Sequence, residues 1–228
     1  MWIKICGNTT LEDVQLAVAH GADAVGFVFA SSPRQVTAEV ASKIIEQLPG
    51  TLEKYGVFVD ANFDAIVNTV RVAGLTGVQL HAADETGLAA RLRKHFAESE
   101  QEIRILQVLH YDAESFHKQL HHMRAHSAVD AVLIDSRTAT KVGGTGLAFD
   151  WNAARESFAR EAPHSRLIVA GGLQPENVAQ AIATLQPWGV DVSSGVESQP
   201  GRKDPARVAA FIQAARSAAA KLENAATV

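Results

Sequence analysis

The chain alternates between short apolar runs and amphipathic helical segments, and this alternation restricts its fold more than any other feature. Eight runs rich in β-branched residues recur along the 228 residues, at a spacing of about 25 to 30 residues. They are nearly continuous in apolar residues, which is typical of parallel strands buried on both faces. The runs are WIKIC, DAVGFVF, KYGVFV, GVQLH, IRILQVL, DAVLID, RLIVAGG and VDVSS.

The segments between these runs have the spacing of amphipathic helices, as in residues 63–70, 178–185 and 208–215. Eight strands, each followed by a helix, predict the α/β class and a single (β/α)8 TIM barrel with eight parallel strands over residues 1–228. A doubly wound open sheet is the alternative, but the glycine fingerprint that it would need after the first strand is missing. The alanine-rich end, about 216–228, is expected to be a helix end that frays.

Composition narrows the class of protein further. The formal net charge of −4 gives no basic face for phosphate backbones, so we expect no nucleic-acid partner. The single cysteine cannot form an internal disulfide, which fits a reducing compartment. The start of the chain lacks the pattern of a signal peptide, and no apolar run has the length of a membrane span. We therefore expect a cytoplasmic protein with no membrane partner.

In a barrel of this kind, the active site lies where the strands end. Cys6 ends the first predicted strand and Asp135 ends the sixth, so a substrate would fit between them. A thiolate at Cys6 would serve as a general base if neighbouring cations or dipoles lowered the pKa of the thiol. Asp135 would then donate a proton. The alternatives are a buried cysteine that only packs and an aspartate that caps a loop.

Other polar residues stand at or near strand ends. Arg34 follows the second strand, and its planar fork suits a substrate carboxylate, although it could equally be a surface arginine. His81 ends the fourth strand, where it would polarise a sugar oxygen or serve only a structural role. His117, His121 and His122 have helical spacing but match a solvated helix face, so we propose no metal site.

Two glycine-containing loops follow the seventh and eighth strands. They carry Gly171 and Gly172 in AGGLQPENV, and Ser194 and Gly195 in VSSGVE. Glycine lets backbone N–H groups approach an anion closely, and barrels often hold a phosphate between these two loops. The alternative is that the glycines only form tight turns. Because no Walker pattern is present, we expect a phosphate on a substrate.

Together these motifs resemble the phosphoribosylanthranilate isomerase family of tryptophan biosynthesis. The resemblance runs from about Trp2 to Ile212 and rests on KICGNT, GFVFASSPR, VQLH, DS followed by GGTGLAFDW, VAGGLQPENV and VDVSSGVESQPGRKD. It implies an Amadori rearrangement of N-(5′-phosphoribosyl)anthranilate, with Cys6 as general base and Asp135 as general acid. Arg34 would bind the anthranilate carboxylate, and the two glycine loops would bind the 5′-phosphate.

The resemblance also implies that Asp191 lies close to the anthranilate part of the substrate, and we include Gly144, in the loop after the sixth strand, among the substrate-binding residues. The reaction only moves protons, so no cofactor is expected. The partner would be a phosphosugar–anthranilate substrate, and the protein a monomer or a homodimer. The alternatives are the related aminoaldose isomerase of histidine synthesis, a dual-substrate enzyme, a phosphate-binding TIM-barrel lyase, or a non-catalytic phosphosugar-binding module.

Overall fold

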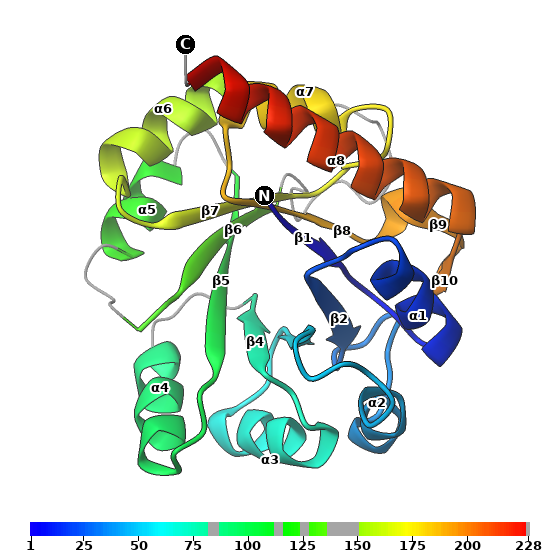
Figure 1. Cartoon of the computed structure of the whole chain (residues 1–228). Helices are drawn as coiled ribbons and strands as arrows, with labels where there is room; N and C mark the ends of the chain where they lie inside the picture. Colours follow the sequence, from blue (N-terminus) through cyan, green and yellow to red (C-terminus); the bar gives the residue numbers. More distant parts are fainter. Residues whose placement is uncertain (82–86, 112–115, 124–127, 136–150, 227–228) are drawn as a thin grey trace.

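A computed structural model describes residues 1–81, 87–111, 116–123, 128–135 and 151–226 of the chain. Eight parallel strands close into a barrel in the order of the sequence, and β1 pairs with both β2 and β8 (Figure 1). The strands are β1 (Trp2–Ile5), β2 (Ala24–Val28), β3 (Glu53–Phe58), β4 (Gly77–Leu80), β5 (Arg104–His110), β6 (Ala131–Asp135), β7 (Arg166–Ala170) and β8 (Gly189–Val192). The predicted barrel is confirmed, and the open sheet is ruled out.

Helices follow the strands and surround the barrel. They are α1 (Leu11–Ala19), α2 (Ala38–Ile45), α3 (Phe63–Ala73), α4 (Leu88–Glu98), α5 (Phe116–Met123), α6 (Trp151–Glu161), α7 (Val178–Leu185) and α8 (Pro205–Ala226). Hydroxyl or amide oxygens begin several of them, because Thr10, Thr37 and Asn62 each accept a backbone N–H of the first turn. The alanine-rich end is helical in α8 as far as Ala226, with Ala215 and Ala219 buried.

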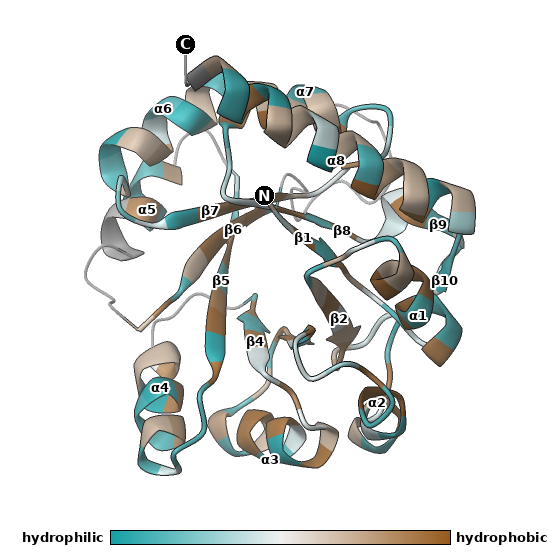
Figure 2. Cartoon of the chain, viewed as in Figure 1, coloured by the Kyte–Doolittle hydropathy of each residue, from teal (hydrophilic) through white to brown (hydrophobic). Residues whose placement is uncertain are grey.

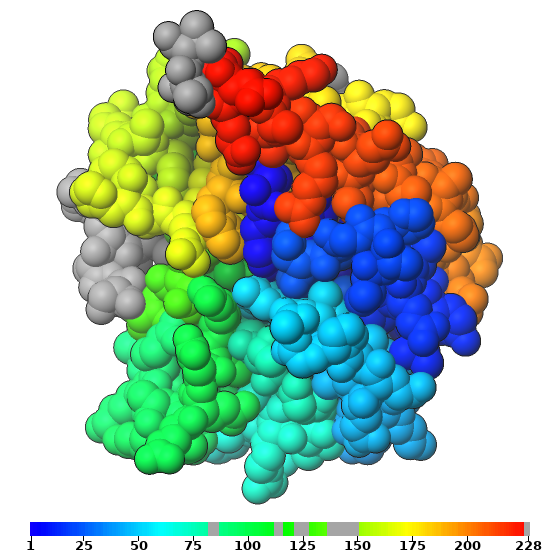
Figure 3. All heavy atoms as spheres, in the orientation of Figure 1, coloured from blue at the N-terminus to red at the C-terminus, as the bar shows by residue number. Residues whose placement is uncertain are grey.

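The barrel has two apolar cores, one on each face of the sheet. Successive strand residues point to opposite faces, so Ile3 and Ile5 pack outward against the helices, whereas Trp2 packs inside the barrel with Tyr55 and Leu106. The strands are therefore largely hydrophobic, and the helices combine apolar and polar residues (Figure 2). In Figure 3, the beginning of β1 is visible in the middle of the molecule, surrounded by later segments of the chain.

Between β8 and α8 the chain makes a small addition to the barrel. A short 3₁₀ helix, η1 (Ser194–Val196), leads into an antiparallel hairpin of β9 (Glu197–Gln199) and β10 (Arg202–Lys203). Thr9, just after β1, donates a hydrogen bond of 2.7 Å to the carbonyl of Gly201 in the turn of this hairpin. The hairpin is thereby attached to the loop that follows the first strand, beside the predicted position of the active site.

Candidate active site

The described residues enclose a cavity of about 210 Å³ at the carboxyl ends of the strands. Six of the predicted site residues line it: Cys6, Arg34, His81, Asp135, Gly171 and Asp191. Cys6 directly follows β1, and Asp135 is the last residue of β6, so the two groups enter the cavity from separate strands. The cavity therefore brings a thiol and a carboxyl group together at the end of the barrel where such enzymes carry their active sites.

Cys6 is held by its backbone and is buried, with 6% of the residue exposed. Its N–H donates to the carbonyl of Val192 on β8 at 2.8 Å, and its own carbonyl accepts from Lys203 Nζ at 2.5 Å. Burial raises the pKa of the Cys6 thiol, and the nearby ammonium groups of Lys4 and Lys203 offset this rise only in part. The lowered pKa that would favour a thiolate is therefore not found at Cys6.

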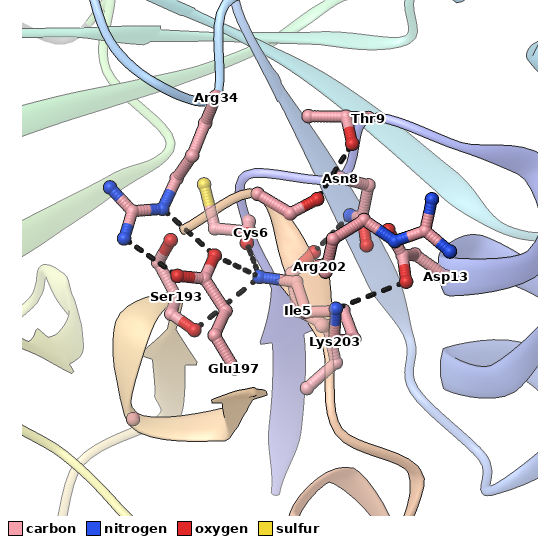
Figure 4. A network of polar contacts seen from close by, with 12 residues as sticks. Ile5, Cys6, Asn8, Thr9, Asp13, Arg34, Ser193, Glu197, Arg202 and Lys203 are labelled. Atoms are coloured by element: carbon pink, nitrogen blue, oxygen red, sulfur yellow. Dashed lines mark hydrogen bonds and ion pairs between the residues drawn. The ribbon is translucent and has the colours of Figure 1, made fainter. Parts of the chain in front are cut away.

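Arg34 does not point a free fork into the cavity. Its Nε and Nη2 donate to the two carboxylate oxygens of Glu197 at 2.8 Å and 2.6 Å, and Figure 4 shows Glu197 between Arg34 and Lys203. These hydrogen bonds raise the pKa of Arg34, while Arg34 and Lys203 together lower the pKa of Glu197 despite its burial. The edge formed by Nη1 and Nη2 is thus the part of the guanidinium left for a substrate carboxylate.

Lys203 is the centre of this polar network. Its ammonium donates to the carbonyl of Cys6, to the carbonyl of Ser193 at 3.3 Å and to Glu197 Oε1 at 3.0 Å. Burial lowers the pKa of Lys203, although the Glu197 carboxylate opposes this effect. One side chain from the hairpin therefore fixes the ends of both β1 and β8 (Figure 4).

His81 and Asp191 line the cavity through contacts with neighbouring side chains. His81 Nε2 lies 3.1 Å from Gln79 Nε2, so the ring nitrogen accepts a hydrogen from the amide in one of its tautomers. Asp191 Oδ1 accepts from Lys4 Nζ at 2.9 Å, and both groups are buried. Its strongest partner in the described structure is thus a lysine of β1, which the sequence analysis did not identify.

The two glycine loops meet beside the cavity. Gly171 borders it, and both Gly171 and Gly172 have the left-handed backbone, with φ of 78° and 65°. A Cβ at Gly195 would overlap the backbone carbonyl of Leu173, so only glycine allows η1 to approach the loop after β7 this closely. Gly172, Ser194 and Gly195 belong to these loops but do not line the cavity as described, and Gly144 lies outside the described residues.

Three charged residues near the site were missed from the sequence: Lys4, Glu197 and Lys203. A signal for Lys4 exists, since it stands two residues before Cys6 in a strand and must share the same face. No local signal exists for Glu197 and Lys203, which reach the site through a hairpin far along the chain. Among the described residues, no group of His, Cys, Asp or Glu side chains is gathered in a way that could hold a metal ion.

The fold and this arrangement define a (β/α)8-barrel enzyme with a thiol and a carboxyl group facing one cavity. The family model of N-(5′-phosphoribosyl)anthranilate (PRA) isomerase matches residues 3–214. The chain belongs to this family, which confirms the resemblance seen in the sequence and removes the lyase alternative. In the part of the chain that the structure describes, no helix is long and apolar enough to cross a membrane.

Curated relatives and solved structures agree with this assignment. The N-(5′-phosphoribosyl)anthranilate isomerase of Citrifermentans bemidjiense is 40% identical over 218 residues, which are 95% of this chain and 98% of that protein. The crystal structure of the phosphoribosyl anthranilate isomerase from Thermotoga maritima is 33% identical, covers 95% of this chain and 99% of that one, and superposes with a TM-score of 0.83. A further structure of the enzyme, with reduced 1-(o-carboxyphenylamino)-1-deoxyribulose 5-phosphate, is 32% identical over the same shares and has a TM-score of 0.77.

Proposed function

We propose that the chain isomerises N-(5′-phosphoribosyl)anthranilate to 1-(2-carboxyphenylamino)-1-deoxyribulose 5-phosphate in tryptophan biosynthesis, with Cys6 and Asp135 as its acid–base pair. The observation that carries this assignment of residues is the shared cavity, which Cys6 enters after β1 and Asp135 enters from β6. A solved relative is described with a reduced form of this product, which supports the same class of small-molecule substrate.

The chemistry requires one acid and one base on separate sides of the sugar. Asp135 gives a proton to the ribose ring oxygen, the bond from that oxygen to C1 breaks, and the nitrogen lone pair forms an iminium ion at C1. The iminium ion acidifies the C2 proton, which the Cys6 thiolate removes as an S–H bond forms. The electron pair of the C2–H bond then forms the enolamine, which tautomerises to the ketone.

Residues in the cavity and in the loops beside it bind the two anionic ends of the substrate. The free edge of Arg34 is suited to the anthranilate carboxylate, and Glu197 fixes the guanidinium from the other edge. The loops after β7 and β8, with Gly171, Gly172, Ser194 and Gly195, present backbone N–H groups to the 5′-phosphate. Gly144 and the position of Asp191 near the anthranilate ring stay predictions from the family resemblance.

The protonation state of the base sets a pH dependence. Burial raises the pKa of the Cys6 thiol, so the thiolate fraction grows as the pH rises on the alkaline side. The rate of alkylation of Cys6 by iodoacetamide should therefore increase with pH in that range. An alkylation rate that does not increase above neutral pH would argue against the ionisable thiol that the base role requires.

The direct test follows the disappearance of N-(5′-phosphoribosyl)anthranilate fluorescence with purified protein. Asp135→Asn should lower kcat about 10²-fold while a product analogue still binds. Asp60→Asn is the matched control, because Asp60 is an exposed aspartate that follows β3 and does not line the cavity. Full activity of Asp135→Asn would remove Asp135 from the acid role, and no turnover by the unmodified protein would refute the proposed function.

Three further expectations belong to the same proposal. Activity on the aminoaldose substrate of histidine synthesis can be tested in the same assay format, and we expect none, because Cys6 stands where that class commonly has an aspartate. One solved relative is described as monomers generated from the dimeric Thermotoga maritima enzyme. We accordingly propose that this chain is a monomer or a homodimer. We also propose that it is located in the cytoplasm.

A further inference from the structure

Lys4 is a fully buried charged residue to which the mechanism above gives no role. Its Nζ donates to Gln79 Oε1 at 2.8 Å and to Asp191 Oδ1 at 2.9 Å, and its side chain has no exposed surface. Burial alone would lower the pKa of Lys4, but Asp191 and Cys6 together outweigh it and the pKa is raised. An ammonium group at this depth is costly to desolvate, so it needs strong compensation and stays charged.

Lys4 and Cys6 lie next to each other inside the barrel. They are separated by one residue on the same strand, so their side chains leave β1 on the same face. On the neighbouring strand, a Cβ added at Gly26 would come within 2.6 Å of Cys6 Sγ and within 3.1 Å of Lys4 Cε. The thiol and the last methylene of the lysine therefore border the same small space, which the absence of a side chain at Gly26 leaves open.

A count of hydrogens distinguishes the two buried lysines near Cys6. Each ammonium has three hydrogens to donate. Lys203 has three oxygen acceptors, which are the carbonyls of Cys6 and Ser193 and the carboxylate of Glu197. Lys4 has two oxygen acceptors among the described residues, on Gln79 and Asp191, which leaves one of its three hydrogens for the neighbouring Cys6 sulfur. Lys4 is thus the lysine that has an N–H available to a thiolate at Cys6.

We propose that Lys4 is a positioning residue that stabilises the thiolate of Cys6, while Gln79 and Asp191 hold its ammonium in place. The inference rests on the base role proposed above for Cys6. Lys4 transfers no proton, since the proton taken from C2 stays on sulfur. The other charged groups that face the thiol are Lys203 from β10 and Asp191 from β8, with Arg34 and Glu197 beyond them. The Asp191 carboxylate disfavours the thiolate by direct repulsion. It also holds the ammonium of Lys4 in place, and this ammonium favours the thiolate.

The test uses the fact that Cys6 is the single cysteine of the chain, so alkylation by iodoacetamide reports on one thiol. In Lys4→Met, the pH midpoint of the alkylation rate should rise by at least about one unit, and kcat/KM should fall at least about 10-fold. Lys54→Met is the matched control. It removes another buried strand lysine, whose Nζ donates to the carbonyl of Pro49, away from the cavity. It should leave the alkylation midpoint unchanged.

A second pair of variants keeps the test valid if Lys4→Met does not fold because Asp191 is left without its partner. The double variant Lys4→Met/Asp191→Asn removes both charges, and it is compared with Asp191→Asn alone. A higher alkylation midpoint in the double variant supports the proposal, and equal midpoints overturn it. Alkylation needs no substrate, so these results do not depend on turnover. If the enzyme is active but the alkylation midpoint does not shift, only the role proposed for Lys4 is refuted. If the midpoint shifts but the unmodified protein shows no turnover, only the proposed function is refuted.

Discussion

The two ends of the barrel differ in where their ion pairs lie. At the carboxyl ends of the strands, the pair of Lys203 and Glu197 is buried, with side chains 0% and 4% exposed. At the opposite end, the pair of Arg104 and Glu53 is open to solvent, with side chains 41% and 28% exposed. Exposed pairs contribute little to stability, whereas charges kept in a dry site are expensive to place there and expensive to leave unpaired.

Aromatic packing explains how the amino end can close without a buried ion pair. Trp2 stacks on Trp188 at 5.2 Å between ring centroids and meets the edge of Tyr55 at 5.8 Å. These rings fill the bottom of the barrel with apolar surface, which is a favourable way to close it. The carboxyl end instead keeps buried lysines and carboxylates around Cys6. We infer that the amino end of the barrel contributes stability. The carboxyl end instead holds a less stable arrangement of buried charges, which can perform chemistry.

The largest expected effect is the loss of activity in Cys6→Ser. A serine hydroxyl is far less acidic than a thiol, so removal of the base should lower kcat by about 10² to 10⁴. The replacement is nearly the same size, so the free energy of unfolding should change by only about 1 kcal/mol. Turnover assays and chemical denaturation of the one variant measure both quantities. Near-normal turnover would make Cys6 a packing residue.

The next effect concerns stability at the same end of the barrel. Glu197→Gln leaves Arg34 and Lys203 without their carboxylate and should lower the free energy of unfolding by about 3 kcal/mol. We take the low end of the range for broken buried pairs because Arg34 is partly exposed. Urea denaturation at neutral pH measures the loss. A loss below about 1 kcal/mol would mean that this buried network behaves like a surface pair.

The same variant has a defined pH dependence. The pKa of Glu197 is lowered in the folded protein, so its ionised form stabilises the fold above the unfolded value of about 4.3. This contribution is lost as the pH falls through the lower folded value. The stability difference between the original protein and Glu197→Gln should therefore be largest above about pH 5 and shrink in more acidic solution.

A smaller effect is expected for Arg34→Lys. The guanidinium binds Glu197 with one edge and has a second edge for the substrate, whereas a single ammonium cannot offer two flat edges. We expect kcat/KM to fall about 10-fold, mainly through a higher KM, because ground-state binding of the carboxylate weakens. Steady-state kinetics test this. An unchanged kcat/KM would remove Arg34 from the substrate site.

The smallest effect should come from Arg104→Gln at the amino end. Arg104 Nε lies 3.7 Å from Glu53 Oε1, and Glu53 keeps its hydrogen bonds to Trp2 and Tyr55 without it. The free energy of unfolding should fall by less than about 1 kcal/mol, and turnover should not change. A loss as large as that of Glu197→Gln would erase the contrast between the two ends.

The barrel could be predicted because its signals are local. Each strand is a short apolar run, and each helix has apolar residues at helical spacing. The order of the strands then follows from right-handed connections between them. The site residues at the strand tips then follow from the topology, as for Cys6 and Asp135. Their positions around one cavity agree with the prediction, while their catalytic roles await the variants described above.

The partners of these residues could not be predicted in the same way. Every residue of β1 is buried, so hydropathy does not say which alternate set faces the inside of the barrel. Arg34 and Glu197 are 163 residues apart, and no pattern in either segment indicates the pairing. The contact of Arg34 with Glu197 and the raised pKa of the Cys6 thiol could not be predicted from the sequence, because long-range contacts and burial decide them.

Closure of the barrel between β1 and β8 also determines when the site comes into existence during folding. Lys4 and Asp191 are 187 residues apart, and Cys6 and Lys203 are 197 apart, so these contacts join the two ends of the chain. Contacts this distant in sequence carry a large loop-closure entropy and form late. A nascent chain that still lacks β8 and β10 therefore has Lys4 and the thiol of Cys6 without these partners. The proposed site is therefore complete only when both ends of the chain have paired in the closed barrel.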